Sequence, residues 1–110
     1  MLTKATKIHA ETILCAAIHI DDGKSYKGQP TNIATGLVLS GHRHGNCFQL
    51  LGILDTYPST RFDGKIEQGF LTSQNRFVNR KQAYTIARAQ QQIISAHQPQ
   101  RGHLLSEDLY

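Results

Sequence analysis

The sequence lacks any long hydrophobic run. Its longest apolar stretch, residues 13–20, is interrupted by His19 and is far shorter than the ~20 residues that cross a bilayer. A lysine follows the first residues, but no apolar signal-peptide core comes after it. We therefore expect a cytoplasmic protein that has no contact with a membrane.

Cysteine is scarce, because the chain has only Cys15 and Cys47. Each stands alone in apolar surroundings, with neither CxxC spacing nor a secretory context. These features favour buried, reduced thiols over a disulfide.

Motifs of the common enzyme classes are also missing. The chain has no Walker-type loop and no GxGxxG, HExxH or GxSxG pattern. Its acidic residues are scattered, and the adjacent pair Asp21-Asp22 is explained by a turn. We therefore predict a protein that is not an enzyme and has neither a cofactor nor a bound metal.

The length of the chain limits the number of domains, and its charge balance bears on the kind of partner. A chain of 110 residues and 12.3 kDa predicts a single domain over residues 1–110, with residues 1–7 as a flexible lead-in. The net charge of +4 and the pI near 9.3 are consistent with an anionic partner. They are equally consistent with a charge that only keeps a small protein soluble.

The first half of the chain reads as strands followed by a helix. Residues 8–20 are too apolar for an exposed edge and predict a central strand. Asp21-Asp22-Gly23-Lys24 predicts a hairpin turn into a second strand at 24–27. Residues 28–32 form a loop, 36–40 a further strand, and 46–54 a helix capped by Asn46 or His44.

The second half predicts a hairpin followed by a helix. The strands are residues 68–73 and 76–78, with Gln74-Asn75 at the tip, after an irregular stretch at 55–64. Asn79 followed by Gln82 is a capping-box pattern, which starts a helix that ends near residue 89 or 93. The apolar ends of segment 104–110 predict that it docks on the domain. The predicted fold class is α+β, with a small antiparallel sheet and two main helices.

The glycine-flanked segment His42-Arg43-His44 has three interpretations. The two histidines stand two residues apart and could bind zinc together with Cys47. The segment could instead hold an anion. The donors would be Arg43, the N-terminus of the following helix, and backbone amides that the flanking glycines leave accessible. The segment could also be an ordinary loop, and the sequence leaves the role of the two histidines open.

Residues 69–80 form a second candidate site, because they combine aromatic, arginine, hydroxyl and amide side chains at a helix N-terminus. Phe70 could stack on a base, Arg76 and Arg80 could grip a pyrophosphate, and Thr72 or Asn79 could contact ribose or base edges. The alternative is that the phenylalanines are core residues and the arginines a solvated face.

The order of motifs in the C-terminal half resembles the first class of Thoeris anti-defence proteins, which are small phage proteins. The motifs are Gly69-Phe70-Leu71-Thr72, Arg76-Phe77-Val78-Asn79-Arg80, Ala83 with Ile86-Ala87, and Leu105-Ser106-Glu107-Asp108-Leu109-Tyr110. The N-terminal strand and the Gly-His-Arg-His segment agree more loosely.

This resemblance implies a sponge that sequesters glycocyclic ADP-ribose, a cyclic nucleotide immune signal, without transforming it. Some members also hold cyclic oligonucleotides of the CBASS type and assemble as hexamers from three dimers. By resemblance, Phe70 stacks on adenine and Asn79 and Arg80 lie beside it, with Thr72 at the ribose. Arg101 is then a phosphate contact, and Arg43 suits the phosphates of a second ligand. The rival functions are a small basic RNA- or DNA-binding module, which we regard as the less favoured partner class, and an enzyme that degrades the same messenger.

Overall fold

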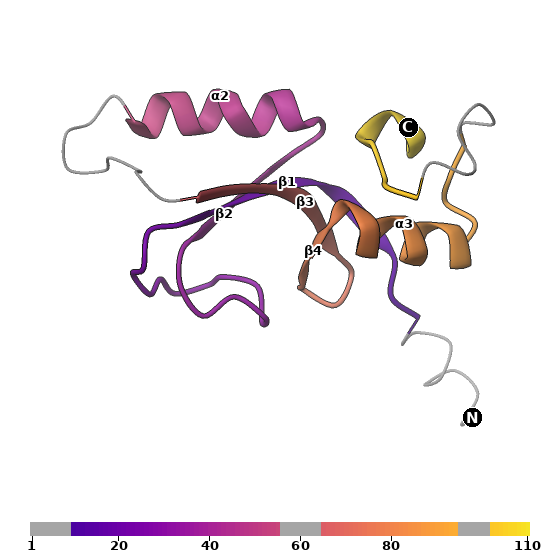
Figure 1. The fold of residues 1–110 in the computed structure, drawn as a ribbon, viewed down its shortest axis with the longest axis horizontal. Coiled ribbons are helices and arrows are strands. Elements are labelled where there is room, and N and C mark those ends of the chain that lie inside the picture. The colour runs from indigo at the N-terminus through magenta and orange to yellow at the C-terminus, as the bar shows by residue number, and fades with distance from the viewer. Residues whose placement is uncertain (1–9, 56–64, 95–101) are drawn as a thin grey trace.

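The computed structural model describes residues 10–55, 65–94 and 102–110. The described chain forms an α+β fold with a four-stranded antiparallel sheet and two α-helices, as the sequence predicts (Figure 1). Its elements in chain order are β1 (Ile13–Asp21), β2 (Leu37–Gly41), α2 (His44–Asp55), β3 (Lys65–Thr72), β4 (Phe77–Asn79), α3 (Arg80–Ala89) and the short 3-10 helix η2 (Ser106–Asp108).

Strand β1 lies inside the sheet, whose order is β2-β1-β3-β4, so the prediction of a central first strand is confirmed. Ala16, Ile18 and Ile20 lie on one face of the strand and Ala17 on the other, and all four are fully buried, because elements cover both faces. The strand begins at Ile13 rather than at residue 8. An irregularity between Ile13 and Cys15 leaves Leu14 exposed.

The predicted strand at 24–27 is wrong. The turn itself forms, since the carboxylates of Asp21 and Asp22 accept hydrogen bonds from the backbone N–H groups of Gly23 and Lys24. The chain after it is polar and exposed, so it has no apolar face to lay on the sheet. The partner of β1 is instead β2, which matches the strand predicted at 36–40 with a shift of one residue.

The loop at 22–36 lies on the side of the sheet opposite α2 (Figure 1) and its amide side chains bond to the outer strands. The Gln29 side chain accepts from the N–H of Val38 at 2.8 Å. The Asn32 side chain donates to the carbonyl of Phe77 at 2.7 Å and accepts from its N–H at 2.9 Å. These bonds occupy backbone groups that an added strand would need at both edges.

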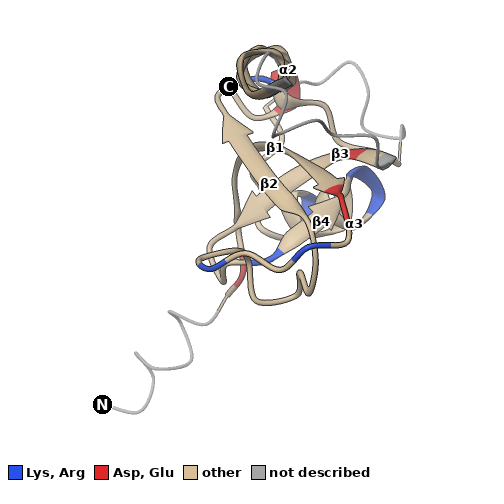
Figure 2. Cartoon of the chain, turned by 90° about the vertical axis from the view of Figure 1, so that its left-hand side faces the viewer, with Lys and Arg blue, Asp and Glu red and all other residues tan. Residues whose placement is uncertain are grey.

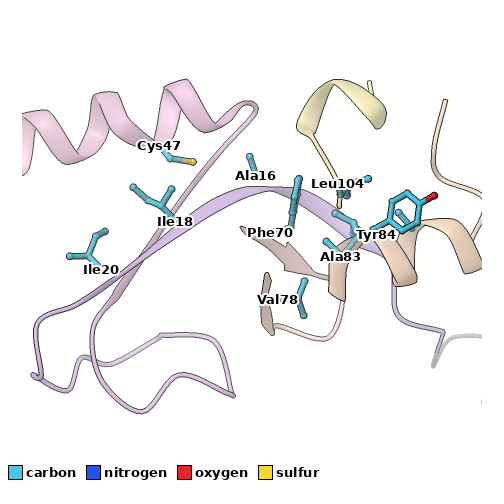
Figure 3. Packing of buried hydrophobic residues seen from close by; sticks show 11 residues of the cluster. Ala16, Ile18, Ile20, Cys47, Phe70, Val78, Ala83, Tyr84 and Leu104 are labelled. Carbon is cyan, nitrogen blue, oxygen red and sulfur yellow. The ribbon is translucent and has the colours of Figure 1, made fainter. Parts of the chain in front are cut away.

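Helix α2 begins at His44, two residues earlier than predicted, and neither proposed cap acts as one. The carbonyl of Arg43 accepts the first helical hydrogen bonds, from the N–H groups of Asn46 and Cys47. The Asn46 side chain reaches back and accepts from the N–H of Arg43 at 2.9 Å. On the inner side of α2, Cys47 belongs to the same core cluster as Ile18 of β1 (Figure 3).

The hairpin of β3 and β4 is confirmed, although β3 starts earlier than predicted. Asn75 takes a positive φ of 58° at the tip, which asparagine tolerates better than most residues. The irregular stretch predicted for 55–64 lies almost entirely outside the described residues.

The capping box at the start of α3 is present in full. The Asn79 side chain accepts from the N–H of Gln82 at 2.8 Å, and the Gln82 side chain accepts from the N–H of Asn79 at 2.9 Å. The helix ends at Ala89, at the earlier of the two predicted ends, before Gln91 adopts a φ of 57°.

Loss of this cap gives a first testable result. We expect Asn79→Ala to lower the free energy of unfolding by about 1 kcal/mol, because two helix N-terminal N–H groups lose their acceptors or orientation. Urea denaturation measures the change. Asn79→Ser retains a capping oxygen and is expected to lose less than half as much. Equal losses in the two variants would contradict the assignment.

The core is one cluster that joins β1, β3, β4, both helices and the C-terminal segment. Phe70, Ala83, Tyr84 and Leu104 meet in it, as Figure 3 shows. Leu104 is fully buried, and its N–H donates to the carbonyl of Arg80 at 2.9 Å. The prediction that the C-terminal segment docks on the domain is therefore confirmed.

Both cysteines are free thiols, as predicted: Cys47 is buried and Cys15 is partly buried. Burial raises the pKa of each thiol, which disfavours the reactive thiolate at neutral pH.

Candidate functional site

The ring of Phe70 is not available to stack on a base. Phe70 is 0% exposed and packs edge-on against the ring of His44, with centroids 5.0 Å apart. Strand pairing places it beside Ala16 of the central strand, on the face that the core cluster covers. The predicted adenine-stacking role is wrong for this fold, and the core interpretation of Phe70 is correct.

Thr72 and Arg76 do come together, but around a carboxylate of the same chain. Glu11 accepts a hydrogen bond from the Thr72 hydroxyl at 2.6 Å and two from the Arg76 guanidinium, both at 2.8 Å. The bonds from Arg76 hold the pKa of Glu11 below its usual value, although burial opposes them. Sequence reasoning assigned Glu11 no role, because its partners lie more than sixty residues away in the chain.

The lowered pKa of Glu11 predicts a specific pH dependence. A carboxyl whose pKa is depressed in the folded state contributes its full stability above the unfolded pKa and loses it as the pH falls through the folded pKa. We expect Glu11→Gln to cost about 1 kcal/mol at pH 7, since the pair is partly exposed. The difference between the two proteins should shrink steadily as urea melts are repeated from about pH 5 to about pH 2. A difference that does not change with pH would refute the assignment.

Asn79 and Arg80 both have structural partners. The Asn79 side chain is used in the α3 cap. Arg80 donates to the carbonyl of Leu104 at 2.8 Å and to the side chain of Gln68 at 2.6 Å, and burial lowers its pKa. Arg80 therefore fixes the C-terminal segment against the start of α3.

A cluster at the start of α2 combines a guanidinium with two stacked rings. The rings of His42 and Tyr110 lie 4.3 Å apart at an angle of 23°, and the guanidinium of Arg43 lies 5.1 Å from the centre of the Tyr110 ring. Arg43 also donates to the carbonyl of Tyr110, and the Tyr110 hydroxyl donates to the carbonyl of His42 at 2.7 Å.

One nitrogen of this cluster has no partner. Among the described residues, Nη1 of Arg43 is buried without a hydrogen-bond acceptor, which is costly for a charged donor. Tyr110 remains 37% exposed, so an outside molecule can contact this residue. The sequence indicated Arg43 but not its partners, because Tyr110 and Arg43 are 67 residues apart.

The C-terminal segment is bonded to two arginines, Arg43 and Arg80. In Figure 1 it lies between the beginning of α2 and α3, where Arg43 contacts Tyr110 and Arg80 contacts Leu104. The buried His44 lies in this region, donating to the carbonyl of Gly69 at 2.8 Å. Burial lowers the pKa of His44, and the charge of Arg80 adds to the effect, so this imidazole is neutral at pH 7.

The zinc interpretation of the glycine-flanked segment does not fit the structure. His42 stacks on Tyr110, whereas His44 bonds to Gly69, so the two rings serve different partners. Within residues 10–55, 65–94 and 102–110, no three His, Cys, Asp or Glu side chains gather as a metal site. Arg101 lies outside the described residues.

Basic residues of the described chain are distributed over several elements. In Figure 2 the blue segments include the loop between β1 and β2 and part of α3, without one continuous stripe. None of the described helices is long and apolar enough to cross a bilayer.

Residues 12–110 match the sequence model of a family described as Phage T4 y16D protein. The chain belongs to this family. The match to the Phage T4 y16D protein family covers every described element from β1 to η2, and it confirms the phage part of the resemblance seen in the motifs. Comparisons with curated proteins and with solved structures gave no match.

Proposed function

We propose that this phage protein binds a cyclic nucleotide immune signal, glycocyclic ADP-ribose, and sequesters it in the host cytoplasm as a homo-oligomer. The motif resemblance and the membership in a phage family support the proposal. The observation that carries it is the cluster of Arg43, His42 and Tyr110, in which a buried guanidinium nitrogen has no hydrogen-bond acceptor and Tyr110 is 37% exposed.

The chemistry of this cluster suits a phosphorylated ring compound. A guanidinium binds phosphate oxygens in a fixed, often bidentate geometry, and an aromatic side chain such as Tyr110 can pack against a base. A cyclic ADP-ribose isomer is a rigid ring and loses little entropy on binding. Nanomolar capture requires about −12 kcal/mol, which such contacts can supply when a site excludes water.

Capture without chemistry agrees with the sequence, which has no Walker-type loop and no GxGxxG, HExxH or GxSxG pattern and whose acidic residues are scattered. Glu11 is bonded to Arg76 and Thr72, and Asp21 and Asp22 accept hydrogen bonds within the turn that follows β1. We therefore propose a binding protein rather than an enzyme that degrades the messenger.

Isothermal titration of glycocyclic ADP-ribose tests this assignment. We expect Arg43→Gln to weaken binding by about 10- to 100-fold, the effect of losing a charged hydrogen-bond donor. Arg88→Gln is the matched control, because Arg88 is exposed in the last turn of α3, and it should bind as the wild type does. The site is wrong if both variants bind equally well.

The net charge of +4 favours a second candidate, a small module that binds RNA or DNA. This function predicts an affinity for a short oligonucleotide that falls steeply with salt, because counterions are released from phosphates. Fluorescence anisotropy at increasing salt distinguishes it from capture of a small ligand, where few phosphates are neutralised.

A further inference from the structure

The two Nη nitrogens of Arg43 are not open to a ligand in the arrangement that the structure shows. Nη2 donates to the carbonyl of Tyr110. Nη1 is buried and, within the described part of the chain, has no acceptor. A bidentate contact with a phosphate needs two accessible guanidinium nitrogens that donate in parallel. A group that covers Arg43 therefore has to move before a phosphate can bind in this way.

Tyr110 is the group that lies against Arg43. The centre of its ring is 5.1 Å from the guanidinium carbon, and the same ring stacks on His42. Its hydroxyl donates to the carbonyl of His42 at 2.7 Å. Burial raises the pKa of Tyr110, so the hydroxyl keeps its proton at pH 7 and remains a donor. This hydrogen bond fastens the ring to the segment that precedes α2.

The segment that carries Tyr110 is anchored before it reaches this residue. Leu104 is fully buried and exchanges two hydrogen bonds with Arg80. Asp108 is also buried, and its carbonyl accepts from the N–H of Ile94 at 2.7 Å. Tyr110, two residues further on, is 37% exposed. A backbone rotation just before Tyr110 therefore moves its ring while Leu104 stays in the core.

We propose that Tyr110 is a lid on the Arg43 site, closed in the free protein and displaced when a phosphorylated ligand binds. This inference rests on the proposed function and adds the regulation of its site. In the closed state, the carbonyl of Tyr110 takes the place of a phosphate oxygen on Nη2. Opening makes both Nη nitrogens available together and releases the ring from His42, so that it can pack against the base of the ligand. Because the ligand binds only the open form, its apparent affinity is reduced by the fraction of molecules that is open.

Tyr110→Phe tests the lid, because it removes the hydroxyl and keeps the ring. The open fraction is expected to rise about 3- to 10-fold, the effect of losing one neutral hydrogen bond. Phenylglyoxal modifies accessible arginine side chains and needs no ligand. The rate at which it modifies Arg43, followed by peptide mass spectrometry, should rise by this factor. The apparent Kd for glycocyclic ADP-ribose should fall by the same factor in isothermal titration.

Tyr26→Phe is the matched control. Tyr26 is also 37% exposed, and its hydroxyl also donates, to the side chain of Asp22, but it lies in the loop between β1 and β2. This variant should leave the modification rate of Arg43 unchanged, and circular dichroism and a thermal melt verify the fold of both variants.

Two results would overturn the lid. One is an Arg43 modification rate that is equal in the wild type and Tyr110→Phe, and the other is an equal rise in Tyr26→Phe. A faster rate in Tyr110→Phe, without binding of glycocyclic ADP-ribose by either protein, would support the lid and refute the proposed ligand. The modification assay thus separates a failure of this inference from a failure of the proposed function.

Discussion

Replacing Phe70 by alanine is expected to lower the free energy of unfolding by about 3–5 kcal/mol, the usual cost of removing a buried phenyl ring. Phe70 has no exposed surface and lies in the core cluster with Ala16, His44 and Val78 around it. Because a domain of this size has a total stability of about 5–15 kcal/mol, the variant should be partly unfolded under mild denaturing conditions. Urea denaturation followed by circular dichroism measures the loss.

Phe70→Leu provides the control for this prediction. Leucine fills most of the space, so we expect a loss well below that of alanine. If Phe70→Ala kept the wild-type stability and lost only its affinity for a nucleotide, the ring would belong to a binding site and its assignment to the core would be wrong.

Gly69→Ala is expected to be comparably damaging, even though it adds only one methyl group. A Cβ at this position would lie 2.1 Å from the carbonyl oxygen of Val78 and 2.7 Å from Cζ of Phe77. The oxygen belongs to the backbone of the paired strand β4, so relief requires the two strands to separate. We expect a loss of about 3 kcal/mol, at the upper end of overpacking effects, visible in a thermal melt.

Gly52→Ala is the matched glycine control. A Cβ at Gly52 meets nothing within 4 Å, and alanine is favoured over glycine inside a helix by about 0.5–1 kcal/mol. We therefore expect a small gain in stability. A similar loss in the two variants would show that the close approach at Gly69 is not the cause.

Local patterns in the sequence predicted most of the fold. The apolar run at 13–20 predicted a strand inside the sheet, and β1 lies between β2 and β3. The Asn79 and Gln82 pair specified the start of α3, because both halves of the box lie within one turn. The prediction of a strand at 24–27 was wrong, because a turn pattern does not show which later segment pairs with the first strand. Leu37–Gly41 is the segment that pairs with β1.

The candidate site was less predictable, because its contacts join distant parts of the chain. The motif around Phe70 indicated a nucleotide pocket. In the hairpin, however, side chains alternate between the two faces of the strand, and Phe70 lies on the face that is covered by the core. Glu11 meets Arg76, and Tyr110 meets Arg43, through the docking of the two terminal segments. No spacing within a segment encodes such a pairing.

The central claim is that the protein holds a phosphorylated cyclic signal and leaves it chemically intact. The direct measurement mixes excess purified protein with glycocyclic ADP-ribose, removes the protein by filtration, then heat-denatures it and quantifies the released nucleotide by mass spectrometry. The proposed function predicts that the filtrate is depleted and that heating returns the full amount unaltered. A filtrate that keeps all of the nucleotide, or a released compound of different mass or retention time, would contradict it.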